Sequence, residues 1–114
     1  MKIFYCKYFP SKNFYAINLF GFVFARRDYG LLSKVDENHE AIHSRQMSEM
    51  LFIPFYLWYI MEWLVRLVQY RDRHEAYKNI SFEREAYTKM YDISYLNKRE
   101  RFSFIHYLRE KSYL

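Results

Sequence analysis

The chain has 114 residues and a net charge of +5, and 52% of its residues are hydrophobic, including 23% that are aromatic. This length predicts one domain, residues 1–114, with a real core but no room for a deep cleft between two lobes. Two glycines and two prolines exclude a disordered or linker-rich chain, and a single cysteine, Cys6, excludes an internal disulfide. Because no secretory signal pattern opens the sequence, we expect a reducing, cytoplasmic setting.

The predicted strands lie in residues 14–27, after an aromatic and basic segment at residues 1–9. The sequence Pro-Ser-Lys-Asn at residues 10–13 predicts a turn, and residues 14–27 are rich in aromatic and β-branched side chains, with Gly21 as a break. This pattern predicts a short N-terminal β-hairpin or small sheet. Such a sheet covers the core or, where its edge lies beside a catalytic helix, holds an extended peptide through backbone hydrogen bonds.

Residues 33–50 form the next predicted element, a helix that opens with a capping box at Ser33. Within it, the sequence His39-Glu40-Ala41-Ile42-His43 has the form HExxH. Histidines four residues apart stand on one face of a helix, so both imidazoles can reach one metal ion. Glu40 lies beside them, where a carboxylate can take a proton from a metal-bound water as that water attacks.

The apolar periodicity of this helix turns both histidines inward, on the stripe that also holds Val35, Ile42 and Met50. Buried imidazoles beside a carboxylate cost free energy unless hydrogen bonds or a metal satisfy them. One metal ion would satisfy all of them together. Gln46 lies near the same face, where its amide can bond a ligand or the backbone.

Residues 50–70 are the most apolar stretch, and they raise the question of a membrane span. Glu62 and Arg66 interrupt the stretch, and its uninterrupted part is about 12 residues long, which is too short to cross a bilayer. Pro54 fits the first turn of a new helix. We therefore expect a buried helix carrying a Glu62–Arg66 ion pair. The alternative is an aromatic helix that lies on a membrane surface.

Residues 71–79 are polar and predict a connection that contains His74. A loop histidine of this kind is usually exposed, although it could polarise a substrate carbonyl if the loop folded over a metal. Ser81 then predicts the cap of another helix. The last segment, residues 95–114, mixes basic and aromatic residues and predicts a final amphipathic helix. No nucleic-acid motif accompanies these residues, so we do not expect a nucleic-acid partner.

The helix that starts near Ser81 holds two candidates for a third metal ligand, Glu83 and Glu85. Two residues apart on a helix, these side chains point about 200° away from each other, so only one can face the metal. Ala86 lies on the side of Glu83 and is small enough to let this helix approach the HExxH helix closely. This favours Glu83, whose alternative role is to complement the helix dipole.

The sequence HEAIH followed downstream by EREAY resembles the gluzincin group of zinc metallopeptidases, in particular small bacterial domains with HExxHxxQ and ExxA motifs. The residues that match these motifs are His39, Glu40, His43, Gln46, Glu83 and Ala86. The resemblance covers roughly residues 33–92, and it implies zinc on His39, His43 and Glu83 with Glu40 as general base. Tyr70, Tyr77 and Tyr87 are candidates for stabilising an oxyanion.

These patterns together predict an α+β fold, with a short N-terminal β-hairpin or small sheet followed by three to four helices in a minimal zincin-like arrangement. The predicted function is a zinc-dependent metallohydrolase, peptidase-like, acting on a peptide or protein. The alternative is a noncatalytic module that contacts a membrane surface or a partner protein and keeps a structural or vestigial metal site.

Overall fold

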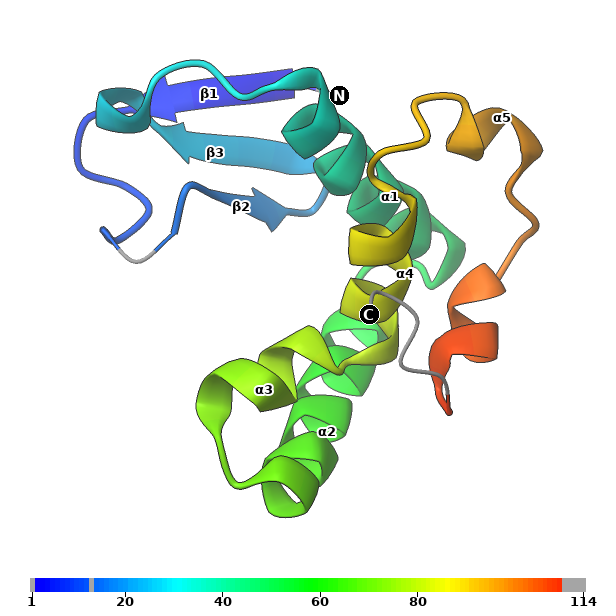
Figure 1. Ribbon diagram of the computed structural model, residues 1–114. Coiled ribbons are helices and arrows are strands. Elements are labelled where there is room, and N and C mark those ends of the chain that lie inside the picture. The colour runs from blue at the N-terminus through cyan, green and yellow to red at the C-terminus, as the bar shows by residue number, and fades with distance from the viewer. Residues whose placement is uncertain (1, 13, 110–114) are drawn as a thin grey trace.

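The computed structural model describes residues 2–12 and 14–109, which form a small sheet followed by helices (Figure 1). The strands are β1 (Lys2–Cys6), β2 (Ala16–Leu19) and β3 (Phe22–Arg26). The central strand is β3, which runs parallel to β1 and antiparallel to β2. The predicted α+β class is confirmed. The predicted hairpin corresponds to β2 and β3, joined at Phe20 and Gly21, which both have positive φ as a two-residue hairpin turn requires.

Five α-helices follow within the described residues: α1 (Lys34–Glu49), α2 (Ile53–Tyr70), α3 (Arg73–Lys78), α4 (Ser81–Lys89) and α5 (Tyr95–Lys98). The Ser33 hydroxyl caps α1 as predicted, accepting from the Asp36 backbone N–H at 3.1 Å. The predictions for residues 71–79 and for the C-terminal segment were wrong. The polar connection contains a helix, α3, because Asp72 caps it by accepting from the Glu75 N–H. In place of one final helix, the chain forms α5 and a 3₁₀ turn at Ser103–Tyr107, while residues 110–114 lie outside the described part.

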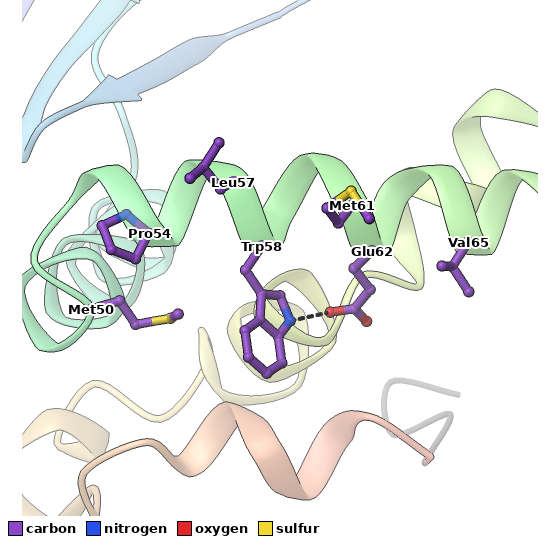
Figure 2. A pocket seen from close by; sticks show the side chains of 7 residues that line it. All are labelled: Met50, Pro54, Leu57, Trp58, Met61, Glu62 and Val65. Atoms are coloured by element: carbon purple, nitrogen blue, oxygen red, sulfur yellow. Dashed lines mark hydrogen bonds between the residues drawn. The ribbon is translucent and has the colours of Figure 1, made fainter.

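Helix α2 lies within the predicted stretch of residues 50–70, ends with it at Tyr70 and has Pro54 in its first turn as expected, but it is not a buried helix. Its fully buried residues are Phe55, Glu62 and Arg66, and its aliphatic side faces outward. Figure 2 shows this side, with Trp58 donating to Glu62 at 3.1 Å. Among the described residues no single helix is long and apolar enough to cross a membrane. By length and composition alone, α1 and α2 pass that test as a pair bent by 112°.

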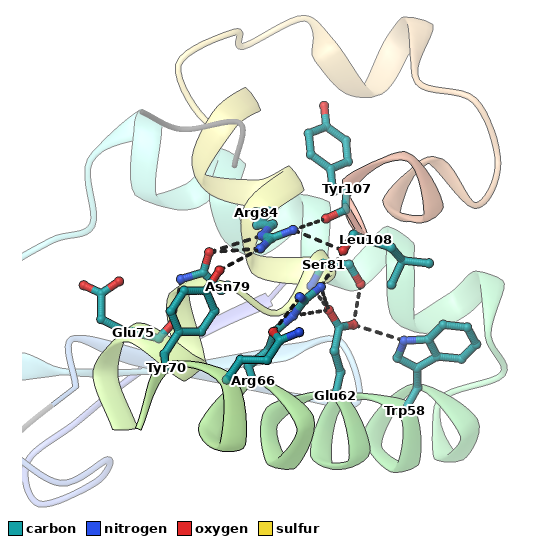
Figure 3. Close-up of polar contacts among 11 residues, drawn as sticks. Trp58, Glu62, Arg66, Tyr70, Glu75, Asn79, Ser81, Arg84, Tyr107 and Leu108 are labelled. Carbon is teal, nitrogen blue, oxygen red and sulfur yellow. Dashed lines mark hydrogen bonds and ion pairs between the residues drawn. The ribbon is translucent and has the colours of Figure 1, made fainter. Parts of the chain in front are cut away.

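The two charged residues of α2, Glu62 and Arg66, point inward because they form hydrogen bonds with other parts of the chain (Figure 3). The Glu62 carboxylate accepts from the backbone N–H and the hydroxyl of Ser81, each at 2.6 Å, and from the Arg66 guanidinium. Arg66 also donates to the Leu108 carbonyl at 2.6 Å. Ser81 is therefore the first residue of α4 and not its cap, as we had expected, because Glu62 satisfies the start of that helix.

The core consists of two clusters that share the pair α1 and α4. The larger cluster contains Met47, Phe55, Ile80, Phe82 and Phe104. The smaller cluster joins Ile42 of α1 to Ala86 of α4 and to Tyr95. The inner side of the sheet lies against α1, since the Asn18 side chain donates to the Glu40 carbonyl and to the Ser44 hydroxyl. Helices α1 and α4 thus form the centre of the fold (Figure 1).

Candidate metal centre

Three potential metal ligands converge between α1 and α4. The Nε2 atoms of His39 and His43 lie 3.1 Å apart, and Oε1 of Glu83 lies 3.3 Å from the first and 3.0 Å from the second. All three residues are buried. Among the described residues, these three side chains form a group that could hold a metal ion. The sequence analysis selected the same three residues.

Local structure places each of these atoms. His39 and His43 are one helical turn apart on α1, and their rings meet edge to face at 4.7 Å. Helix α4 brings Glu83 to them because Ala86, fully buried and packed against Ile42, adds no bulk between the helices. The expectation that Ala86 permits this close approach is confirmed.

Two amide side chains of α1, Asn38 before the histidines and Gln46 after them, donate hydrogen bonds to the backbone at the two ends of α4. The Asn38 side chain donates to the carbonyls of Met90 and Asp92 at 2.9 and 3.0 Å, at the C-terminal end of α4. The Gln46 side chain donates to the Phe82 carbonyl at 3.1 Å, at the N-terminal end. The two helices are therefore antiparallel and are joined at both ends of the candidate site.

Gln46 also sets the tautomer of His43. Its amide nitrogen donates to Phe82 and to Glu85 Oε1, so its oxygen is the atom that faces His43 Nδ1 at 2.8 Å. Because an amide oxygen only accepts, Nδ1 of His43 carries the proton. In the neutral ring, Nε2 then presents its lone pair toward Glu83 and His39, as a metal ligand must.

Glu85, the rival candidate, points away from this group into a buried network of its own. Its carboxylate accepts from the Arg99 guanidinium, from the Tyr95 hydroxyl at 2.6 Å and from Gln46. Arg99 also donates to Glu49 at 2.6 Å. Glu85 is therefore a support for Gln46 and, through Gln46, for His43.

Tyr59 of α2 is a residue of the site that the sequence analysis did not select. Its hydroxyl donates to Glu83 Oε2 at 2.7 Å, which leaves Oε1 directed at the histidines. Burial, followed by the charge of Glu83, raises the pKa of Tyr59 well above its ordinary value, so the hydroxyl keeps its proton. The sequence does contain a signal, because Tyr59 shares the buried side of α2 with Phe55, Glu62 and Arg66 at helical spacing.

Without a metal, His43 and Glu83 interact as a tight ion pair. Burial lowers the pKa of His43, but the adjacent Glu83 carboxylate outweighs burial and raises this pKa to about 9. Burial conversely raises the pKa of Glu83, and the charges and hydrogen bonds of His43 and His39 hold it well below its usual range. Glu83 is therefore an anion at neutral pH, as a ligand must be.

Glu40 lies beside the three-residue group without belonging to it. Its side chain is half-buried, and burial raises its pKa, partly opposed by His43 and His39. A raised pKa moves a carboxylate toward the range in which it exchanges protons near neutral pH. Glu40 thus has the electrostatic environment of a candidate general base.

Two of the three predicted tyrosines lie at the site. The hydroxyls of Tyr77 and Tyr87 lie 2.9 Å apart, and the Tyr87 ring packs edge to face on His39 at 4.6 Å. Tyr70 instead accepts from Arg84 at 3.4 Å (Figure 3). His74 lies exposed on α3, with its ring beside that of Tyr77.

The candidate centre is closed rather than open. The side chains of His39, His43 and Glu83 are 9%, 7% and 5% exposed. Two surface pockets of the described residues lie elsewhere, along α2 and around Arg84. Compared with known proteins, the chain matches no family model, no curated protein and no solved structure. Any function proposed for the site therefore depends on its geometry and on the sequence motif.

Proposed function

We propose that this chain is a minimal zinc-dependent metallohydrolase, peptidase-like, with His39, His43 and Glu83 as zinc ligands and Glu40 as general base. The observation that carries the proposal is the convergence of two imidazole nitrogens and one carboxylate oxygen from two helices. The resemblance of HEAIH and EREAY to the gluzincin motifs supports the same assignment.

The donor set and its spacing fit zinc. Donors held about 2.0–2.2 Å from one zinc ion in tetrahedral geometry lie about 3.3 Å from each other. The three donor atoms lie 3.0–3.3 Å apart. Two histidines and one carboxylate are also a set that hydrolytic zinc enzymes use, with the fourth position left for water. The protonated Nδ1 of His43 and the Tyr59 bond to Glu83 orient two of the three ligands.

Each nearby residue then has a role in hydrolysis. His39, His43 and Glu83 would hold the zinc ion, which would supply a lowered pKa for water and polarisation of a substrate carbonyl. Glu40 would accept the proton of the attacking water and return it to the leaving group. The Tyr77–Tyr87 hydroxyl pair stands beside His39, where a phenol can donate to a developing oxyanion. Strand β2 is an edge strand that lies against α1, and it is the element that would hold an extended peptide.

The first experiment measures metal content by native mass spectrometry. We expect one zinc per chain, and loss of this zinc in His39→Ala and in His43→Ala, because two remaining ligands hold zinc poorly. His74→Ala is the matched control, since His74 is exposed on α3, and it should keep full occupancy. Full occupancy in both site variants would rule out the assignment.

The second experiment separates catalysis from metal binding by digesting a peptide library. Glu40→Gln keeps all three ligands but cannot accept a proton, so we expect zinc to stay bound while cleavage falls by roughly 10²- to 10⁴-fold. Glu37→Gln, the same change on the same helix, is the control and should cleave normally. Identical digests from wild type and Glu40→Gln would end the enzyme proposal and leave only the metal site.

The burial of the group favours one alternative, a structural metal site in a noncatalytic module. Substrate must reach the metal, yet all three ligand side chains are less than a tenth exposed. The β2 edge is also partly used, because the Asn18 carbonyl accepts from Tyr56 at 3.2 Å. For a structural site, chelation would lower the melting temperature sharply, and Glu40→Gln would change no reaction.

A further inference from the structure

Helix α2 reverses the usual arrangement of an amphipathic helix, in which charged residues face solvent and apolar residues face the core. Its two charged residues, Glu62 and Arg66, are buried against α4 and the segment near Leu108, and its outer side carries no charge at all. The outer side is a stripe of aliphatic residues, here called the α2 stripe: Leu57, Ile60, Met61, Leu64, Val65 and Val68. Between 46% and 77% of each of these residues is exposed.

The spacing of the stripe is that of a helix-packing seam. Leu57, Met61, Leu64 and Val68 follow one another at intervals of four, three and four residues. This is the spacing with which one helix packs along another through knobs and holes. At its first half, the stripe continues into a groove lined by Met50, Pro54 and Trp58, which Figure 2 shows beside Leu57 and Met61. A helix seam beside a groove fits a second helix better than it fits an extended peptide.

The size of the stripe matches one half of a protein interface. Six aliphatic residues that are about half exposed present roughly 500–600 Å², and the exposed border residues Ile53 and Trp58 bring the total close to the ~800 Å² per partner of a standard interface. The absence of charge and the presence of methionine and tryptophan are also typical of the centre of an interface.

We propose that the α2 stripe is the contact surface of a homodimer, in which α2 of one copy packs against α2 of a second copy. A two-fold dimer needs a patch that complements itself, and a uniformly aliphatic, uncharged seam does so. A helix lying on an anionic membrane instead carries Lys or Arg along its polar borders. The borders of the α2 stripe are Trp58, Trp63 and Tyr56, and the one cation of α2, Arg66, is buried in its bond to Glu62.

Oligomeric mass in detergent-free buffer tests the proposal. We expect light scattering of the wild-type protein at about 10–100 µM to give twice the 14.4 kDa chain mass, as a standard-size interface would. Leu64→Glu places a charge at the middle of the seam and should yield a monomer with an unchanged far-UV circular dichroism spectrum. Leu31→Glu is the control, because Leu31 is more exposed than Leu64, 83% against 46%, but lies before α1, and this variant should remain dimeric.

Cross-linking gives a second test that does not depend on a disruptive variant. In a Cys6→Ser background, Met61→Cys lies near the middle of the stripe, so it meets its own copy whether the two helices run parallel or antiparallel. A short bismaleimide should link it to a dimer and should leave Leu31→Cys unlinked. A monomeric wild type, equal masses for Leu64→Glu and Leu31→Glu, or equal cross-linking of both cysteines would overturn the proposal. So would a monomer that pellets with phosphatidylglycerol vesicles through Leu64, because lipid would then be the occupant.

Discussion

Replacing Arg99 with methionine should destabilise this protein more than replacing a solvent-exposed residue, although Arg99 is not one of the three candidate metal ligands. The guanidinium is fully buried, and it joins two carboxylates, the fully buried Glu85 and the largely buried Glu49. Methionine roughly keeps the volume but removes the charge, which leaves Glu85 with Tyr95 and Gln46 as its donors among the described residues. Removing one partner of a buried ion pair costs about 3–5 kcal/mol.

For a domain of this size, each kcal/mol lowers the melting temperature by about 4 °C, so Arg99→Met should lower it by about 12–20 °C. Calorimetry on the wild type, Arg99→Met and Lys98→Met measures the effect. Lys98 is the matched control, since its ion pair with Asp92 is exposed to solvent and contributes little to stability. Adding Glu85→Gln to Arg99→Met should recover part of the loss, because the unpaired charge is gone. Equal melting temperatures for the Arg99 and Lys98 variants would refute this reasoning.

Three further predictions concern the metal centre. Glu83→Gln should lower bound zinc by native mass spectrometry, whereas Glu85→Gln should keep the zinc and lower the melting temperature, since it weakens the Arg99 network. Gln46→Leu should weaken zinc binding by about 10- to 100-fold in competition with a chelator, because it frees the His43 tautomer, while the exposed Gln69→Leu should not. In metal-free protein, the folded-state pKa of His43 is about 9 against 6.5 for a free imidazole, so its stabilisation is complete below pH 6.5 and is lost as pH rises through 9. Urea titrations should therefore show a loss of about 3 kcal/mol between pH 6 and pH 9, and an equal loss in Glu83→Gln would contradict the pairing.

The sequence predicted the candidate site well where the relevant geometry is local. The spacing of His39 and His43 and the cap at Ser33 depend only on one helix. The choice of Glu83 over Glu85 needed one further fact, that α4 approaches α1 on the side of Ala86, and a small residue at helical spacing indicates this. These three ligand candidates come together in the structure as the pattern required.

The predictions that failed depend on contacts between distant segments. Hydrophobicity indicated that α2 is buried, yet its aliphatic side is exposed because Glu62 is needed inside to bond the start of α4. The same bond removed Ser81 from its expected capping role. Helical spacing places Tyr59 on the same side of α2 as Glu62 and Arg66, but selecting it for the site among 13 tyrosines also required knowing that α2 passes beside Glu83. Nothing in residues 95–109 marks where α5 ends, since Arg99 leaves the helix to reach Glu85 and Glu49.

The two amide side chains that join α1 to α4, Asn38 and Gln46, would reduce the free energy needed to order the candidate site when a metal binds. Asn38 and Gln46 hold backbone carbonyls at opposite ends of α4, so a slip of one turn, about 5.4 Å, would break both sets of hydrogen bonds at once. The register between the helices is therefore set by groups that bind no metal. His39, His43 and Glu83 are preorganised, so a metal ion would bind there without first having to bring two helices together.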